Sequence, residues 1–110
     1  MEFVNLTPHA LSVHKLNGEV LILPPSGTVA RVAVTRSAAP PIGDVATAYS
    51  NFGEVTDLPE PVLGTCYIVS AMVALASAKG DSPRWDVLSP GELIRDDAGR
   101  PVGCRGLTCY

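Results

Sequence analysis

The fold is set most clearly by the sequence LSVHKLNGEVLIL at residues 11–23. Residues Leu11–His14 alternate apolar and polar side chains, which is the pattern of a half-buried strand. The pair Asn17-Gly18 follows, and it is preferred in type I′ turns because both central positions need a positive φ. Residues Glu19–Leu23 then supply a partner strand. The stretch therefore predicts an antiparallel β-hairpin.

Short extended segments are expected on both sides of this hairpin. They lie at Glu2–Leu6, Val29–Thr35, Cys66–Val69, Glu92–Arg95 and Val102–Arg105. The last two are joined by residues 96–100, a plausible loop with a glycine for a positive φ. A turn is expected just before them, at residues 89–91.

The connection from Arg36 to Pro61 holds four of the ten prolines, near its two ends. A structureless loop of this length is unusual in a compact domain. We therefore expect part of it to pair on the sheet, with short strands at Val45–Tyr49 and Phe52–Val55.

One helix is expected, beginning after Ser70 and ending at Lys79. The Ser70 hydroxyl can accept a hydrogen bond from an amide of the first turn, and Gly80 suits the position just past the end. Met72, Leu75, Ala76 and Lys79 fall on one helical stripe. The predicted fold class is α+β: a curved antiparallel sheet, either a roll or a partial barrel, with one short helix near residues 70–79.

Composition limits the classes of function. A length of 110 residues is that of one domain, so residues 1–110 are taken as a single unit. Only 17% of residues are charged, which leaves room for a buried interface between copies and favours a homo-oligomer. The net charge of -3 disfavours non-specific nucleic-acid binding. No run of about 18 apolar residues and no secretory signal occurs, which predicts a cytoplasmic protein without a membrane segment.

No cofactor or metal site is predicted. The chain has three cysteines, and this odd number argues against a closed disulfide framework. They lack Cys-x-x-Cys spacing, so a zinc site is not expected. No nucleophile motif accompanies the serines. His9 or His14 as an acid–base catalyst is the weakest interpretation, because neither has a partnered nucleophile.

The basic residues are biased towards arginine, six against two lysines. A guanidinium group grips phosphate or carboxylate with two hydrogen bonds. The candidate phosphate ligands are Arg31, Arg95, Arg100 and Arg105, with Arg95 and Arg105 expected to be neighbours across the last hairpin. The alternative is that these arginines reflect coding bias and only solvate the surface.

A second candidate group lies near the N-terminus. Asn5, Thr7 and His9 alternate, so an extended backbone would place them on one face. They could then contact the ribose or base of a ligand. The alternative is a turn in which Asn5 and Thr7 hydrogen-bond the local backbone.

Several segments resemble small accessory proteins encoded by tailed phages and prophages. The resemblance lies in Asn-Leu-Thr-Pro-His-Ala at 5–10, Pro-Pro-Ser-Gly-Thr-Val-Ala-Arg-Val at 24–32, Gly-Thr with Tyr-Ile-Val-Ser within 64–70, and Arg-Asp with Gly-Arg within 95–100. It covers most of the chain. It implies a phage setting and no mechanism, because that group has no settled activity.

Some small phage proteins block host defence by sequestering nucleotide signals without cleaving them. By this analogy we expect a non-enzymatic anti-defence protein that binds a phosphorylated nucleotide signal at pockets between its copies. The alternative is a protein-interaction inhibitor or a small virion accessory protein that has no small-molecule ligand and uses exposed sheet edges and apolar surface.

Overall fold

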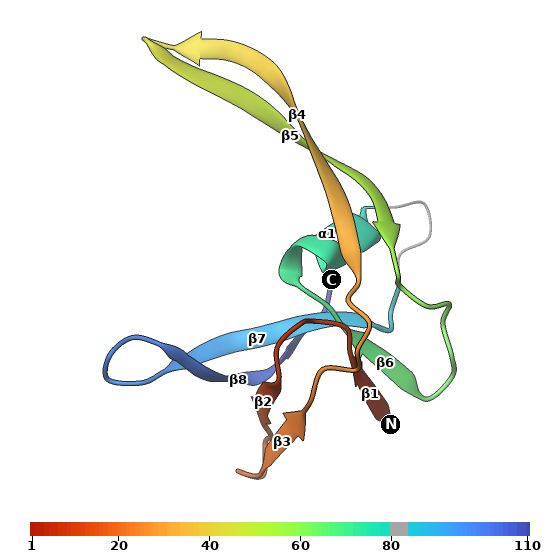
Figure 1. Cartoon of the computed structure of the whole chain (residues 1–110). Helices are drawn as coiled ribbons and strands as arrows, with labels where there is room; N and C mark the ends of the chain where they lie inside the picture. Colours follow the sequence, from red (N-terminus) through yellow and green to blue (C-terminus); the bar gives the residue numbers. More distant parts are fainter. Residues whose placement is uncertain (80–83) are drawn as a thin grey trace.

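The structure, a computed structural model, describes residues 1–79 and 84–110 (Figure 1). Its strands are β1 (Glu2–Asn5), β2 (Leu11–His14), β3 (Val20–Leu23), β4 (Arg31–Ile42), β5 (Val45–Thr56), β6 (Thr65–Ile68), β7 (Val87–Arg95) and β8 (Pro101–Thr108). The helix of the described residues is α1 (Ala71–Ala78). The expected curved sheet with one short helix is confirmed, but the chain is mostly β and fits the α+β class only loosely.

Six strands form the main sheet, in the order β1-β6-β7-β8-β2-β3. The prediction of an antiparallel sheet was wrong, because the sheet is mixed. β1 pairs parallel with β6, β6 with β7, and β2 with β8. Alternation along one strand shows which side chains are buried but carries no information on the direction of a distant neighbour. The parallel pairings therefore left no signal in the local pattern.

The hairpin predicted at residues 11–23 is present as β2 and β3, with Leu11 opposite Leu23 and His14 opposite Val20. Its turn differs from the expected type I′. Gly18 has a φ of 88° and Asn17 has no positive φ. The Lys15 amide donates to the Glu19 carbonyl at 2.8 Å, which leaves a three-residue loop closed by a left-handed glycine.

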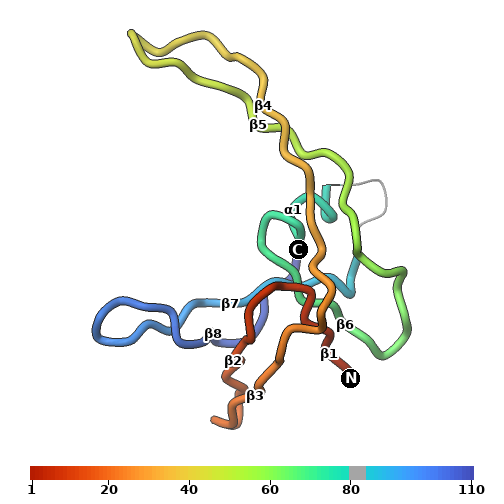
Figure 2. The backbone as a smooth tube through the Cα atoms, viewed as in Figure 1, coloured from red at the N-terminus to blue at the C-terminus, as the bar shows by residue number. Residues whose placement is uncertain are grey.

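Strands β4 and β5 form a separate two-stranded ribbon, here called the arm (Figures 1 and 2). The arm projects from the body of the molecule, and its tip is the turn at Gly43 and Asp44. The expectation that part of residues 36–61 would pair on the main sheet was therefore wrong, but the short strands expected at Val45–Tyr49 and Phe52–Val55 are present within β5. Strands β4 and β5 are adjacent in the chain, so they pair with each other at the lowest loop-closure cost.

Helix α1 begins where the sequence predicted. Ser70 is its N-cap and accepts a hydrogen bond from the Val73 amide, and Lys79 is the C-cap. Gly80 lies outside the described residues. The helix buries Val73 and Ala74, whereas Met72 and Leu75 of the predicted stripe are exposed.

Apolar residues are buried on both faces of the central strands. Tyr67 of β6 and Val87 of β7 join a cluster with Val73 and Ala74 of the helix. Their sequence neighbours Ile68 and Leu88 point to the other face and pack with Val13. Burial on both faces is typical of parallel strands, which fits the pairing of β6 with β7.

The turn predicted at residues 89–91 does not exist, because these residues lie inside β7. Gly91 is needed there for close approach of the two strands. A Cβ at this position would contact the Arg105 carbonyl oxygen and lie 2.8 Å from that of Gly106. Strand β7 therefore continues to Arg95 and returns as β8, and the predicted loop at 96–100 joins them, with Gly99 at a φ of 81°.

Candidate functional site

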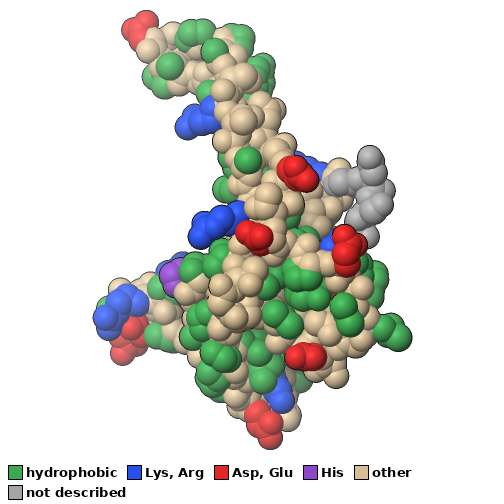
Figure 3. All heavy atoms as spheres, turned by 45° about the vertical axis from the view of Figure 1, so that its right-hand side comes forward, with side chains coloured by type: hydrophobic (Ala, Val, Ile, Leu, Met, Phe, Trp, Pro, Cys, Tyr) green, Lys and Arg blue, Asp and Glu red, His purple; other side chains and the backbone are tan. Residues whose placement is uncertain are grey.

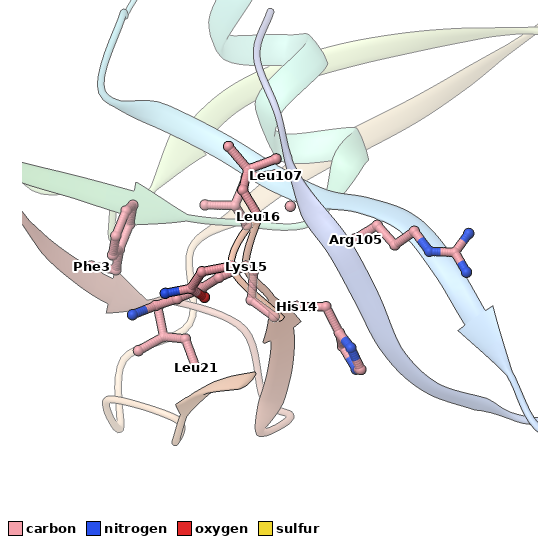
Figure 4. Close-up of a pocket in the computed structure, with 10 residues that line it drawn as sticks. Phe3, His14, Lys15, Leu16, Leu21, Arg105 and Leu107 are labelled. Carbon is pink, nitrogen blue, oxygen red and sulfur yellow. The ribbon is translucent and has the colours of Figure 1, made fainter. Parts of the chain in front are cut away.

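A hollow of about 780 Å³ lies beside β2 and β8 and is called the β2–β8 hollow (Figure 4). Its lining is Phe3, Val13, His14, Lys15, Leu16, Asn17, Leu21, Arg105, Gly106 and Leu107. The volume is within the range of small-molecule sites. Apolar side chains make up half of the lining, and three basic side chains accompany them. This combination suits a ligand that has both a flat apolar part and anionic groups.

The parallel pairing of β2 with β8 produces this arrangement. His14 and Arg105 are partners in the register, so their side chains leave the same face of the sheet. Lys15 follows His14 and points to the opposite side, towards Phe3 and Leu21 (Figure 4). The basic side chains of the hollow are therefore not clustered: Lys15 lies at one end, and His14 and Arg105 lie at the other.

The cations of the hollow are only weakly held by carboxylates. Lys15 Nζ lies 3.7 Å from Glu19 Oε2, and Arg105 Nη1 lies 3.8 Å from a Glu92 oxygen. All four side chains are largely exposed, and exposed pairs contribute about 0–1 kcal/mol. A phosphate group can replace either carboxylate at little cost.

Asn5 and Thr7 are buried, and their side chains are engaged within the fold. The Asn5 amide nitrogen donates to the carbonyls of His9, at 2.7 Å, and Leu23, at 3.0 Å. Its amide oxygen accepts from the backbone N–H of Thr7, at 2.9 Å, and from the Thr7 hydroxyl, at 2.7 Å. This network ties β1 to β3 and matches the local-turn alternative that the sequence left open.

The other predicted ligands lie apart from one another. His9 lines a second hollow of about 440 Å³, beside β7 and β8. Arg31 lines a smaller one of about 240 Å³, together with Thr7 and Ser70. Within one chain, therefore, only Arg105 of the predicted set lines the β2–β8 hollow.

Arg95 and Arg100 lie at the end of the β7–β8 hairpin. Arg95 donates to the Gly99 carbonyl at 2.9 Å, and Arg100 Nε lies 3.1 Å from Asp96 Oδ2. Arg95 and Arg105 are not neighbours, because Arg95 is opposite Pro101 and Arg105 is opposite Glu92. The register is shifted by an irregularity between Ile94 and Arg95, which residue spacing did not reveal.

Sequence reasoning missed His14 and Lys15 as ligand candidates. The local signal was a basic pair at the end of a predicted strand. Its proximity to Arg105 depends on a pairing across ninety residues of chain, which no local pattern shows.

An ion pair between the partly buried Arg84 and the buried Asp86 lies just before β7. Arg84 donates from Nε and Nη2 to the two oxygens of Asp86, both at 2.8 Å, and from Nη2 to the Pro59 carbonyl at 2.8 Å. The hydrogen bonds from Arg84 hold the pKa of Asp86 below its usual value, against the effect of burial. The pKa of Arg84 is correspondingly raised. The pair links the segment after the arm to the start of β7.

The described part of the chain holds three free cysteines and no cluster of three or more His, Cys, Asp or Glu residues placed to hold a metal ion. Cys66 and Cys104 are buried, whereas Cys109 is exposed. Burial, with a smaller contribution from Asp86, raises the pKa of the Cys66 thiol.

None of the helices among residues 1–79 and 84–110 has the length and apolar character to cross a membrane. No protein-family model, curated protein or solved structure matches the chain.

Proposed function

We propose that the chain is a non-enzymatic, phage-type anti-defence protein that binds and sequesters a phosphorylated nucleotide signal, and that it works in the host cytoplasm as a homo-oligomer. The observation that supports this most is the β2–β8 hollow, where apolar lining lies between Lys15 on one side and His14 with Arg105 on the other. The phage setting comes from the resemblance of the motifs, and the hollow supplies the ligand chemistry.

The hollow fits a phosphorylated nucleotide in two respects. A base or another flat ring can pack on Phe3, Leu21 and Leu107, which removes apolar surface from water. Phosphate oxygens can then accept hydrogen bonds from Arg105 or Lys15, and such charge-assisted bonds are about twice as strong as neutral ones. The chain as a whole is acidic, so these local cations supply the selectivity for an anion.

Calorimetry with a panel of cyclic and linear nucleotides and ADP-ribose-type compounds tests the proposal. We expect one member to bind tightly and to be recovered intact after the protein is denatured, because the chain sequesters and does not cleave. Arg105→Gln and Lys15→Gln should each weaken binding about tenfold or more, the loss of one charge-assisted contact.

Arg100→Gln is the matched control. Arg100 is an exposed arginine on the same hairpin and does not line the hollow, so its substitution should leave the affinity unchanged. Absence of heat with the whole panel, or equal losses in all three variants, would contradict the proposed site.

The second candidate is a protein-interaction inhibitor or virion accessory protein without a small-molecule ligand. The observation in its favour is the arm, which exposes apolar side chains on a free two-stranded ribbon. Co-purification with a host or virion protein, unchanged by added nucleotide, would favour this function over the first.

A further inference from the structure

The arm leaves a large apolar surface uncovered. Ile42, Val45 and Tyr49 are 74%, 66% and 58% exposed, and Val34 and Phe52 are also exposed. A two-stranded ribbon without further cover is marginally stable in water. The radius of gyration is 16.4 Å, against about 13 Å for a compact chain of this length. The arm is thus built for contact with something outside the chain.

The charges on the arm are few and arranged unevenly. Between Arg36 and Glu54 the sequence contains one charged residue, Asp44 at the tip. Arg31 and Arg36 lie on β4 nearer the body, and neither has an ion-pair partner among the described residues. Figure 3 shows the acidic tip and the basic side chains between it and the body.

We propose that two copies of the chain pack arm against arm in antiparallel fashion, so that the tip of each arm, with Asp44, lies along the part of its partner's β4 that carries Arg31 and Arg36. This inference rests on the homo-oligomer part of the proposed function. A two-fold axis makes both ends of such a contact identical. The arm is complementary to itself in charge, so a second copy suits it better than an unrelated partner.

The charges decide the direction of packing. Parallel arms would place Asp44 against Asp44 at the tip, which is repulsive. Antiparallel arms pair each acid with a base. The tip of the partner's arm must pack against β4 rather than β5. Glu54 on β5 and Asp57 just after it are acidic and would repel Asp44.

A charge exchange between two variants tests the proposal on the full-length protein. In a dimer of Asp44→Arg, the new arginine at each tip faces Arg31 and Arg36 of the partner, so like positive charges meet at both ends. In a dimer of the double variant Arg31→Asp/Arg36→Asp, Asp44 faces two aspartates, so like negative charges meet. Each should weaken the dimer about tenfold or more in analytical ultracentrifugation. When the two are mixed, both ends regain opposite charges, and native mass spectrometry should detect the mixed dimer in excess over either parent dimer.

The double variant Arg95→Asp/Arg100→Asp is the matched control, since it changes the charge equally but lies on the β7–β8 hairpin. Mixed with Asp44→Arg, it should give no preference for the mixed dimer. A monomeric wild-type chain, an arm that binds only another protein, or equal rescue by the control would overturn the proposal. Because no nucleotide is added, these outcomes are independent of whether the β2–β8 hollow binds its ligand.

Discussion

Asp86 illustrates how single residues hold this fold together. Its carboxylate is fully buried, and it remains charged because two hydrogen bonds from Arg84 satisfy both oxygens. The same guanidinium reaches the Pro59 carbonyl, so the pair fixes the segment that leaves the arm. Removing one partner of a buried pair leaves an uncompensated charge or donor, which costs about 3–5 kcal/mol.

The Arg84–Asp86 pair predicts a specific pH dependence. Because the pKa of Asp86 is lowered in the folded chain, its contribution to stability is present above its ordinary pKa of about 3.9 and is lost as the pH falls through the depressed value. Asp86→Asn should lower the free energy of unfolding by about 3 kcal/mol at pH 7. Urea unfolding from pH 7 to pH 2 should show the two proteins converging in stability at the acidic end; a constant difference would exclude this role.

The role of Asn5 could not be predicted from the sequence alone. The alternation of Asn5, Thr7 and His9 is compatible with a ligand contact or with a local turn, and only the fold distinguishes them. The Asn5 amide uses its donors on two carbonyls and its oxygen on two Thr7 donors. Composition and spacing do not reveal such internal satisfaction, because it depends on β3 lying beside the loop.

At the scale of elements, several local signals were reliable, although the type I′ turn at Asn17-Gly18 and the turn at residues 89–91 were wrong; signals for long-range pairing were absent. The β2–β3 hairpin, the Ser70 cap and the 96–100 loop each depend on a few adjacent residues, and all three are present. The parallel pairings of β1, β6 and β7, and of β2 with β8, join distant segments. The β2–β8 hollow depends on one of these pairings, which is why Arg105 was anticipated without His14 and Lys15.

Gly91 provides a test at this scale. Gly91→Ala places a Cβ against the backbone oxygens of Arg105 and Gly106, which cannot move without separating β7 from β8. We expect a loss of about 1–3 kcal/mol in the free energy of unfolding, as for other overpacking changes, and weaker ligand binding because Arg105 shifts. Gly18→Ala is the control: its Cβ would meet open space, so it should cost only the strain of a positive φ and leave the β7–β8 pairing intact. Equal effects of the two changes would argue against the close approach.

At the scale of the whole molecule, the projecting arm is the feature that distinguishes this structure from a simple curved sheet. The longest dimension is 51 Å, although the two sides of the sheet each close a compact apolar cluster. The body can therefore be stable by its own packing, whereas the arm depends on a partner. An arm with Asp44 at its tip, Arg31 and Arg36 on β4 and Glu54 on β5 gives that partner a defined orientation.

Hydrogen exchange of the arm amides, followed as a function of protein concentration, tests the pairing of arms most directly. If two copies cover each other's arms, residues 34–53 exchange slowly at high concentration, and the protection falls on dilution while that of β6 and β7 stays constant. Exchange of the arm at one unchanging rate across all concentrations would contradict the account.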